Sequence, residues 1–144
     1  MPDAPLRVLY VEDDRLGALL VTEMLRDQAG IALRCAEDGA EALALAAQWP
    51  PQLLLLDAWL PDTSGHRLLQ ELRALPGLAA VPAIMCSADG SEDDRQRARD
   101  SGFAEFWAKP VQVEAVRQAL RRWQALLIGD PAGSPGPGTD NGGR

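Results

Sequence analysis

The sequence contains little of what several classes of protein require. Its two cysteines, Cys35 and Cys86, lack metal-ligand spacing, so we expect buried free thiols and neither a disulfide framework nor a zinc site. The single histidine, His66, is expected at the surface. The first apolar run, residues 8–11, is too short for a signal peptide, and no run reaches the length of a membrane span. We therefore expect a cytoplasmic protein without membrane association.

Basic residues are scarce as well. The chain has 14 Lys and Arg against 21 Asp and Glu, a net charge of −7, and nucleic-acid binding needs the opposite balance on one face. Its 144 residues, 47% hydrophobic and 24% charged, suit one globular domain. We place that domain at 5–128. Residues 129–144 are rich in Gly, Pro and Ser and are expected to form a disordered tail, because they cannot bury enough apolar surface. No output domain is expected beyond it.

Apolar runs and amphipathic segments alternate along the chain at short spacing. This alternation is typical of a parallel α/β sheet. The run 53–56 consists of leucine alone, which predicts a central strand that is buried on both faces. The expected strands are 7–11, 31–34, 53–56, 81–86 and 103–107. The expected helices are 15–28, 40–48, 65–75, 91–101 and 111–127.

Charged side chains directly follow three of the expected strands. Glu12 and Asp13 follow the first, Asp57 follows the third, and Lys109 follows the fifth. The carboxyl ends of parallel strands meet in one crevice, so these groups are expected to converge. Carboxylates gathered there repel one another unless a cation neutralises them, and oxygen ligands suit Mg²⁺. Each residue alone could be a helix cap or a surface charge. In combination they predict a phosphoryl-transfer site, with the lysine beside a phosphoryl oxygen.

These motifs, Val11-Glu12-Asp13-Asp14, the leucine run ending at Asp57 and Trp107-Ala108-Lys109-Pro110, resemble response-regulator receiver domains of two-component signalling. The resemblance covers residues 7–127. It implies an α/β fold with a doubly wound, five-stranded parallel sheet of flavodoxin-like strand order 2-1-3-4-5 and five helices. It also implies a cis peptide bond between Lys109 and Pro110, a state that is essentially confined to X–Pro bonds.

The resemblance assigns a role to each site residue. Asp57 corresponds to the phosphoacceptor and Lys109 to the site lysine. The Mg²⁺ ligands it implies are Glu12, Asp13, Asp57 and the backbone carbonyl of Trp59. Ser87 corresponds to the switch hydroxyl and Phe106 to the switch aromatic residue.

The function implied is that of a signalling protein whose only catalysis is its own phosphorylation and dephosphorylation. Asp57 would take a phosphoryl group from a sensor histidine kinase or a histidine phosphotransfer protein. Binding of a downstream protein target would then change at the face of the fourth helix, fifth strand and fifth helix. The fourth helix, 91–101, has almost no residue of buried type except Ala98, so low local stability is expected. A homodimer is an open alternative.

Three other readings compete with a stand-alone receiver. An aspartate-dependent phosphohydrolase of the haloacid-dehalogenase type would have a second Asp where Trp59 stands, and would need further insertions. A pseudo-receiver would bind partners without phosphorylation, although the acidic set, Ser87 and Lys109 are all present. A receiver module of a hybrid kinase or phosphorelay is the third. The starting Met and the polar tail favour the independent protein.

Overall fold

A five-stranded parallel sheet forms the centre of the protein. The computed structural model describes residues 4–129. The strands are β1 (Leu6–Val11), β2 (Ile31–Ala36), β3 (Leu53–Asp57), β4 (Ala83–Ser87) and β5 (Glu105–Ala108). Their order is β2-β1-β3-β4-β5, and all four pairings are parallel. The predicted fold class and strand order are therefore confirmed.

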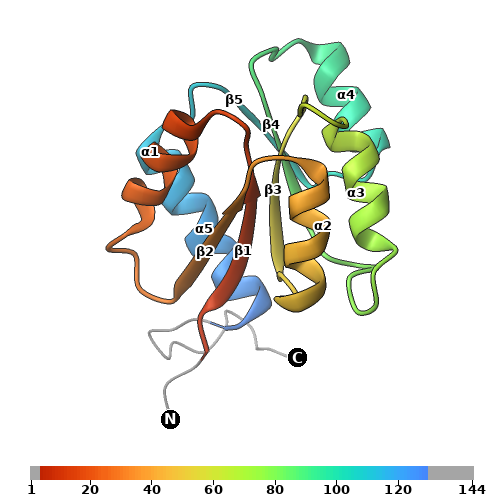
Figure 1. Ribbon diagram of the computed structural model, residues 1–144. Coiled ribbons are helices and arrows are strands. Elements are labelled where there is room, and N and C mark those ends of the chain that lie inside the picture. The colour runs from red at the N-terminus through yellow and green to blue at the C-terminus, as the bar shows by residue number, and fades with distance from the viewer. Residues whose placement is uncertain (1–3, 130–144) are drawn as a thin grey trace, which may run out of the picture.

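Helices cover both faces of the sheet. They are α1 (Arg15–Leu25), α2 (Gly39–Gln48), α3 (Gly65–Arg73), α4 (Glu92–Asp100) and α5 (Val113–Leu127). Figure 1 shows α1 and α5 on one face and α2, α3 and α4 on the other. The apolar core is correspondingly divided into two clusters, one under each layer of helices. The helices α1 to α4 thus each connect two successive strands by crossing over a face of the sheet, as parallel pairing requires.

The leucine run of β3 serves both clusters. Leu54 and Leu56 belong to the cluster beneath α2 and α3, whereas Leu53 and Leu55 belong to the cluster beneath α1 and α5. Successive side chains of a strand point to opposite faces, so a strand that is covered twice has no polar alternation. Every residue of β3 is buried, which confirms the prediction for this segment.

The structure moves several element boundaries. The first helix ends at Leu25 instead of residue 28, and a turn joins it to Gly30, whose φ is +80°. This backbone conformation favours glycine, and a Cβ there would also displace the side chain of Gln124, whose Nε2 would lie 2.0 Å away. The second strand continues to Ala36, because it pairs with β1 as far as Val11. This extension depends on tertiary pairing, which the local sequence pattern does not record.

The exposure of Cys35 and of His66 differs from the prediction. Cys35 is exposed because its strand lies at the sheet edge, whereas Cys86 is buried as expected. His66 is half-buried: its Nδ1 lies 2.7 Å from the hydroxyl of Ser101, so it links α3 to the end of α4.

The fourth helix is as weakly anchored as its composition predicted. Ala98 is its one buried residue. Ser91 caps the helix by accepting a hydrogen bond from the backbone N–H of Asp94. Little apolar area therefore holds this helix on the sheet.

The predicted tail lies outside the described residues, apart from Gly129. Across the part of the chain that is described, no helix is both long and apolar enough to cross a membrane.

Candidate functional site

The predicted site residues lie at the carboxyl-terminal edge of the sheet. Asp57 and Ser87 are the last residues of β3 and β4, and Glu12 directly follows β1. Lys109 follows β5, and its backbone N–H donates to the carbonyl of Ser87 at 2.8 Å. The topology therefore brings together groups that are separated by up to 97 positions in the chain.

Lys109 is the chain's only lysine, and it joins two carboxylates. Its Nζ lies 2.6 Å from Oε1 of Glu12 and 3.1 Å from Oδ1 of Asp57. The Lys109 side chain is 27% exposed, whereas those of Glu12 and Asp57 are 3% and 11% exposed. Charges this deeply buried are found paired, because the loss of hydration would otherwise cost several kcal/mol.

Glu12 is fixed by donors on three sides. Besides Lys109, the Tyr10 hydroxyl donates to Oε1 at 3.2 Å and the backbone N–H of Asp14 donates to Oε2 at 3.2 Å. Burial alone would raise the pKa of Glu12, but the hydrogen bonds from Lys109 and Asp14 outweigh it and lower that pKa. Glu12 therefore stays ionised. Burial, together with the neighbouring negative charges, raises the pKa of Tyr10, which remains a donor.

Asp57 has the opposite electrostatic character. Burial and the negative charge of Glu12 raise its pKa from 3.8 to about 6, more than the charge of Lys109 can offset. Burial alone would lower the pKa of Lys109, but its contacts with Glu12 and Asp57 raise that pKa. One lysine thus neutralises only part of the charge of two buried carboxylates. The remaining negative charge favours the binding of a further cation.

Three carboxylates could hold that cation as a metal ion. One oxygen each of Glu12, Asp13 and Asp57 lie within 4.8 Å of one another, with Asp13 exposed and the other two buried. An all-oxygen donor set of this charge fits a hard divalent cation such as Mg²⁺. The raised pKa of Asp57 is consistent with this, because a cation would favour its ionised form.

Gly65 allows α3 to begin directly beside Asp57. A Cβ on Gly65 would lie 2.4 Å from the backbone carbonyl oxygen of Asp57, far inside contact distance. Its N–H donates to the carbonyl of Ala58 at 2.9 Å, and Ser64 caps the helix. A glycine is therefore required where α3 begins beside the site.

The predicted switch residues flank the acidic site on β4 and β5. Ser87 is 3% exposed, and its Oγ accepts a hydrogen bond from the backbone N–H of Asp89 at 3.1 Å. Phe106 is half-buried, and the guanidinium of Arg95 lies 4.8 Å from the centre of its ring. Sequence reasoning missed Arg95, because nothing in a helix so rich in charge distinguishes the one arginine that covers an aromatic ring. Trp59 is 69% exposed beside the site.

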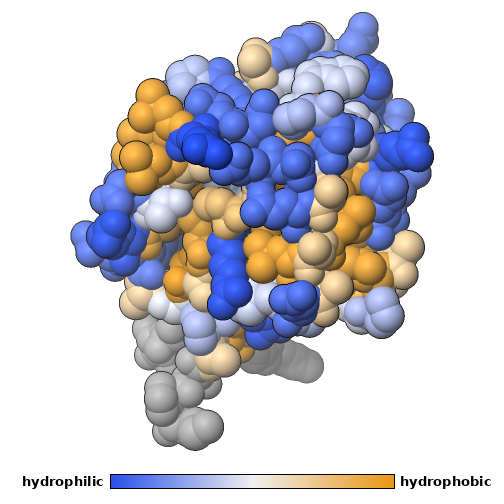
Figure 2. Space-filling view, in the orientation of Figure 1, coloured by the Kyte–Doolittle hydropathy of each residue, from blue (hydrophilic) through white to orange (hydrophobic). Residues whose placement is uncertain are grey.

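An apolar surface adjoins the acidic loop. Leu16, Leu19 and Leu20 of α1 are all more than half exposed, and Figure 2 shows an apolar patch where α1 lies in Figure 1. Two of them, Leu16 and Leu20, line a cavity of about 430 Å³ that reaches Lys109 and Pro110. The peptide bond between Lys109 and Pro110 is cis, which confirms that prediction.

Comparisons with known proteins agree with this arrangement. The family profile described as the response regulator receiver domain matches residues 8–121. The DNA-binding dual master transcriptional regulator RpaA of Synechocystis is 36% identical over 121 residues, which are 84% of this chain and 48% of RpaA. An uncharacterized 14.6 kDa protein of Leptolyngbya boryana is 36% identical over 79% of this chain and 87% of its own length. This chain therefore spans about half the length of RpaA but most of the smaller protein.

A solved structure gives the same result for the fold. The chemotaxis protein CheY4 of Vibrio cholerae superposes with a TM-score of 0.76 and 27% sequence identity, over 83% of this chain and 98% of CheY4. The match to the family profile extends from β1 into α5 and so includes every strand and the whole acidic edge of the sheet. The chain belongs to the response regulator receiver domain family of two-component signalling.

Proposed function

We propose that Asp57 accepts a phosphoryl group from the phosphohistidine of a sensor histidine kinase or a histidine phosphotransfer protein. The observation that carries this proposal is the contact of a buried carboxylate with the chain's only lysine, beside two further carboxylates. An Asp57 oxygen attacks phosphorus in line with the departing histidine nitrogen. The new O–P bond forms as the N–P bond breaks, and the product is an aspartyl phosphate.

The other residues of the edge position charge around that step. Lys109 already lies 3.1 Å from Asp57, so it can pair with a phosphoryl oxygen by a small displacement. Glu12, Asp13, Asp57 and the backbone carbonyl of Trp59 would hold Mg²⁺, which would neutralise the charge that gathers on the phosphoryl oxygens. We place the reaction in the cytoplasm, where kinases have ATP.

The change in partner binding follows from the charge that phosphorylation adds at Asp57. A phosphoryl group brings roughly two negative charges and strong acceptor oxygens. Ser87 ends the neighbouring strand, so its hydroxyl would turn to donate to that group, and Phe106 would repack in response. The affinity of the α4–β5–α5 face for a downstream protein would then change, because α4 is held by little apolar contact.

Intact mass measurement tests the proposal. The protein is incubated with Mg²⁺ and acetyl phosphate, beside the Asp57→Asn variant and an Asp93→Asn control, which makes the same change at an exposed position. We expect one metal-dependent phosphoryl adduct in the wild-type protein and in the control, and none in Asp57→Asn. Folded wild-type protein that forms no adduct with several donors would instead indicate a receiver that binds its partners constitutively.

A further inference from the structure

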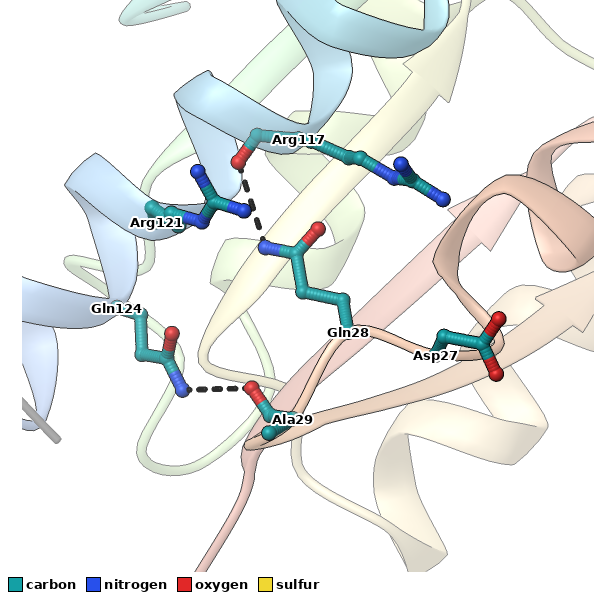
Figure 3. A pocket seen from close by; sticks show the side chains of 6 residues that line it. All are labelled: Asp27, Gln28, Ala29, Arg117, Arg121 and Gln124. Carbon is teal, nitrogen blue, oxygen red and sulfur yellow. Dashed lines mark hydrogen bonds between the residues drawn. The ribbon is translucent and has the colours of Figure 1, made fainter.

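A second cavity lies at the opposite edge of the sheet from the acidic site. It has a volume of about 450 Å³, within the range of roughly 300–1,000 Å³ that is usual for small-molecule sites. It lies between α5 and the loop that joins α1 to β2, ahead of the first residue of that strand (Figure 3). Its lining residues are Asp27, Gln28, Ala29, Arg117, Arg121 and Gln124.

Hydrogen bonds hold the walls of this cavity in place. Gln124 is 5% exposed, and its Nε2 lies 3.3 Å from the carbonyl oxygen of Ala29 and 3.1 Å from that of Gly30. Across the cavity, Nε2 of Gln28 donates to the carbonyl of Arg117 at 3.3 Å. The loop is therefore fixed to α5 from two directions, and the cavity exists before any ligand arrives.

One buried acceptor in this wall lacks a donor. Oε1 of Gln28 is inaccessible to solvent and has no hydrogen-bond partner among the described residues. Reversing the amide does not help, because the oxygen would then face the carbonyl of Arg117, which is also an acceptor. Buried acceptors are nearly always satisfied. A donor in the cavity reaches this atom only when an adjoining side chain moves, and that of Arg121, which is exposed, can do so.

Positive charge at the same cavity is only partly neutralised, by Glu114 and Asp27. Arg117 and Arg121 are one turn apart on α5, and Figure 3 shows the Gln28 amide between their side chains. Arg121 makes no ion pair or hydrogen bond within residues 4–129. Arg117 has one carboxylate neighbour, the exposed Glu114 at 3.7 Å. In a chain of net charge −7, this local excess of guanidinium groups favours an anion.

We propose that this cavity binds a protonated phosphate group, as inorganic phosphate or as a phosphomonoester. Its ionised oxygens accept hydrogen bonds from Arg121 and Arg117, and its O–H donates to Oε1 of Gln28. An oxyanion without a proton satisfies the arginines but leaves the buried amide oxygen unpaired. Asp27, the acidic residue of the lining, opposes any anion and limits the affinity. The proposal does not depend on the role of Asp57.

The test compares phosphate with sulfate, which carries no proton at neutral pH. Amide chemical shifts of the full chain are followed in chelator at constant ionic strength, with each ion in turn. We expect saturable shifts at residues 28–30 and 117–124 with phosphate in the millimolar range, and at least about tenfold weaker binding of sulfate. A further titration compares AMP with phosphate at pH 5.5, where a phosphomonoester is mostly its protonated monoanion, and identifies the source. Tighter binding of AMP assigns the cavity to phosphomonoesters, and equal or weaker binding assigns it to the free ion.

Four variants separate the contributions. Arg121→Gln should weaken phosphate binding about tenfold, whereas Arg122→Gln, the same change at an arginine already paired with Glu105, should leave it unaltered. Gln28→Met should abolish the preference for phosphate over sulfate, and Asp27→Asn should strengthen binding. The proposal is overturned if wild-type protein shows no saturable shift, if it binds sulfate as well as phosphate, or if the two arginine variants behave alike.

Discussion

At the scale of single residues, Asp57 makes the metal-free protein less stable at neutral pH. Folding raises its pKa from 3.8 to about 6, so the folded state favours the protonated form. A carboxyl group shifted in this direction costs nothing below the unfolded pKa, and its ionisation destabilises the fold progressively as pH rises towards 6. Two units correspond to about 3 kcal/mol at most.

The Asp57→Asn variant should therefore be more stable than wild type in chelator at pH 7.5, by about 1–3 kcal/mol in urea unfolding. The gain should fade as the pH is lowered to 4, and Mg²⁺ should reduce it by stabilising the wild-type carboxylate. Asp93→Asn provides the comparison, and we expect it to stay within about 0.5 kcal/mol of wild type. A variant that is no more stable at pH 7.5 would show that Lys109 already compensates the buried charge.

At the scale of elements, α4 is the helix that should open most readily. Its one buried residue is Ala98, and Arg95 adds a contact of 4.8 Å with the ring of Phe106. We expect the amides of 92–100 to exchange fastest among the helices. Arg95→Gln should accelerate them further, by about two- to fivefold, because an exposed cation–π contact is worth about 0.5–1 kcal/mol. Arg99→Gln, which removes an exposed ion pair, should change exchange less.

A different element, α1, is expected to receive the phosphodonor. Its exposed leucines border the cavity that leads to Lys109. Leu20→Ser should slow phosphotransfer from a histidine phosphotransfer protein about tenfold or more, because an apolar contact is lost, and should leave labelling by acetyl phosphate unchanged. Leu126→Ser alters a leucine that is 70% exposed on α5 and should affect neither rate. Equal loss with both donors would mean that Leu20 supports the site itself.

At the scale of the whole molecule, the features that could be predicted from the sequence are those that follow from the order of strands and helices along the chain. The sequence predicted the parallel sheet and the convergence of Asp57 and Lys109, because groups that follow parallel strands meet at one edge. It did not predict the exposure of Cys35, which depends on the place of β2 at the sheet edge. The cavity beside Gln28 was missed for a related reason. Its other wall is α5, about ninety positions away, and no local pattern records that contact.

Cys86 offers a measure of whether the two halves of the core unfold together. It lies in the cluster beneath α1 and α5, and burial raises its pKa to about 12, so in the native state it should resist thiol reagents. In a Cys35→Ser background, Cys86 is then labelled only when the protein opens.

Leu54 lies in the opposite cluster, beneath α2 and α3. If the sheet unfolds as one unit, Leu54→Ala should destabilise the protein by about 2–5 kcal/mol and accelerate the labelling of Cys86 about 30-fold or more, although the two side chains lie on different faces. The labelling rate would then report the global free energy of unfolding. Labelling that stays at the wild-type rate, while urea unfolding shows the expected loss of stability, would mean that Cys86 is reached through a local opening of α1 and α5. Leu55→Ala, on the same face as Cys86, distinguishes these cases, because a local opening should respond to it and not to Leu54→Ala.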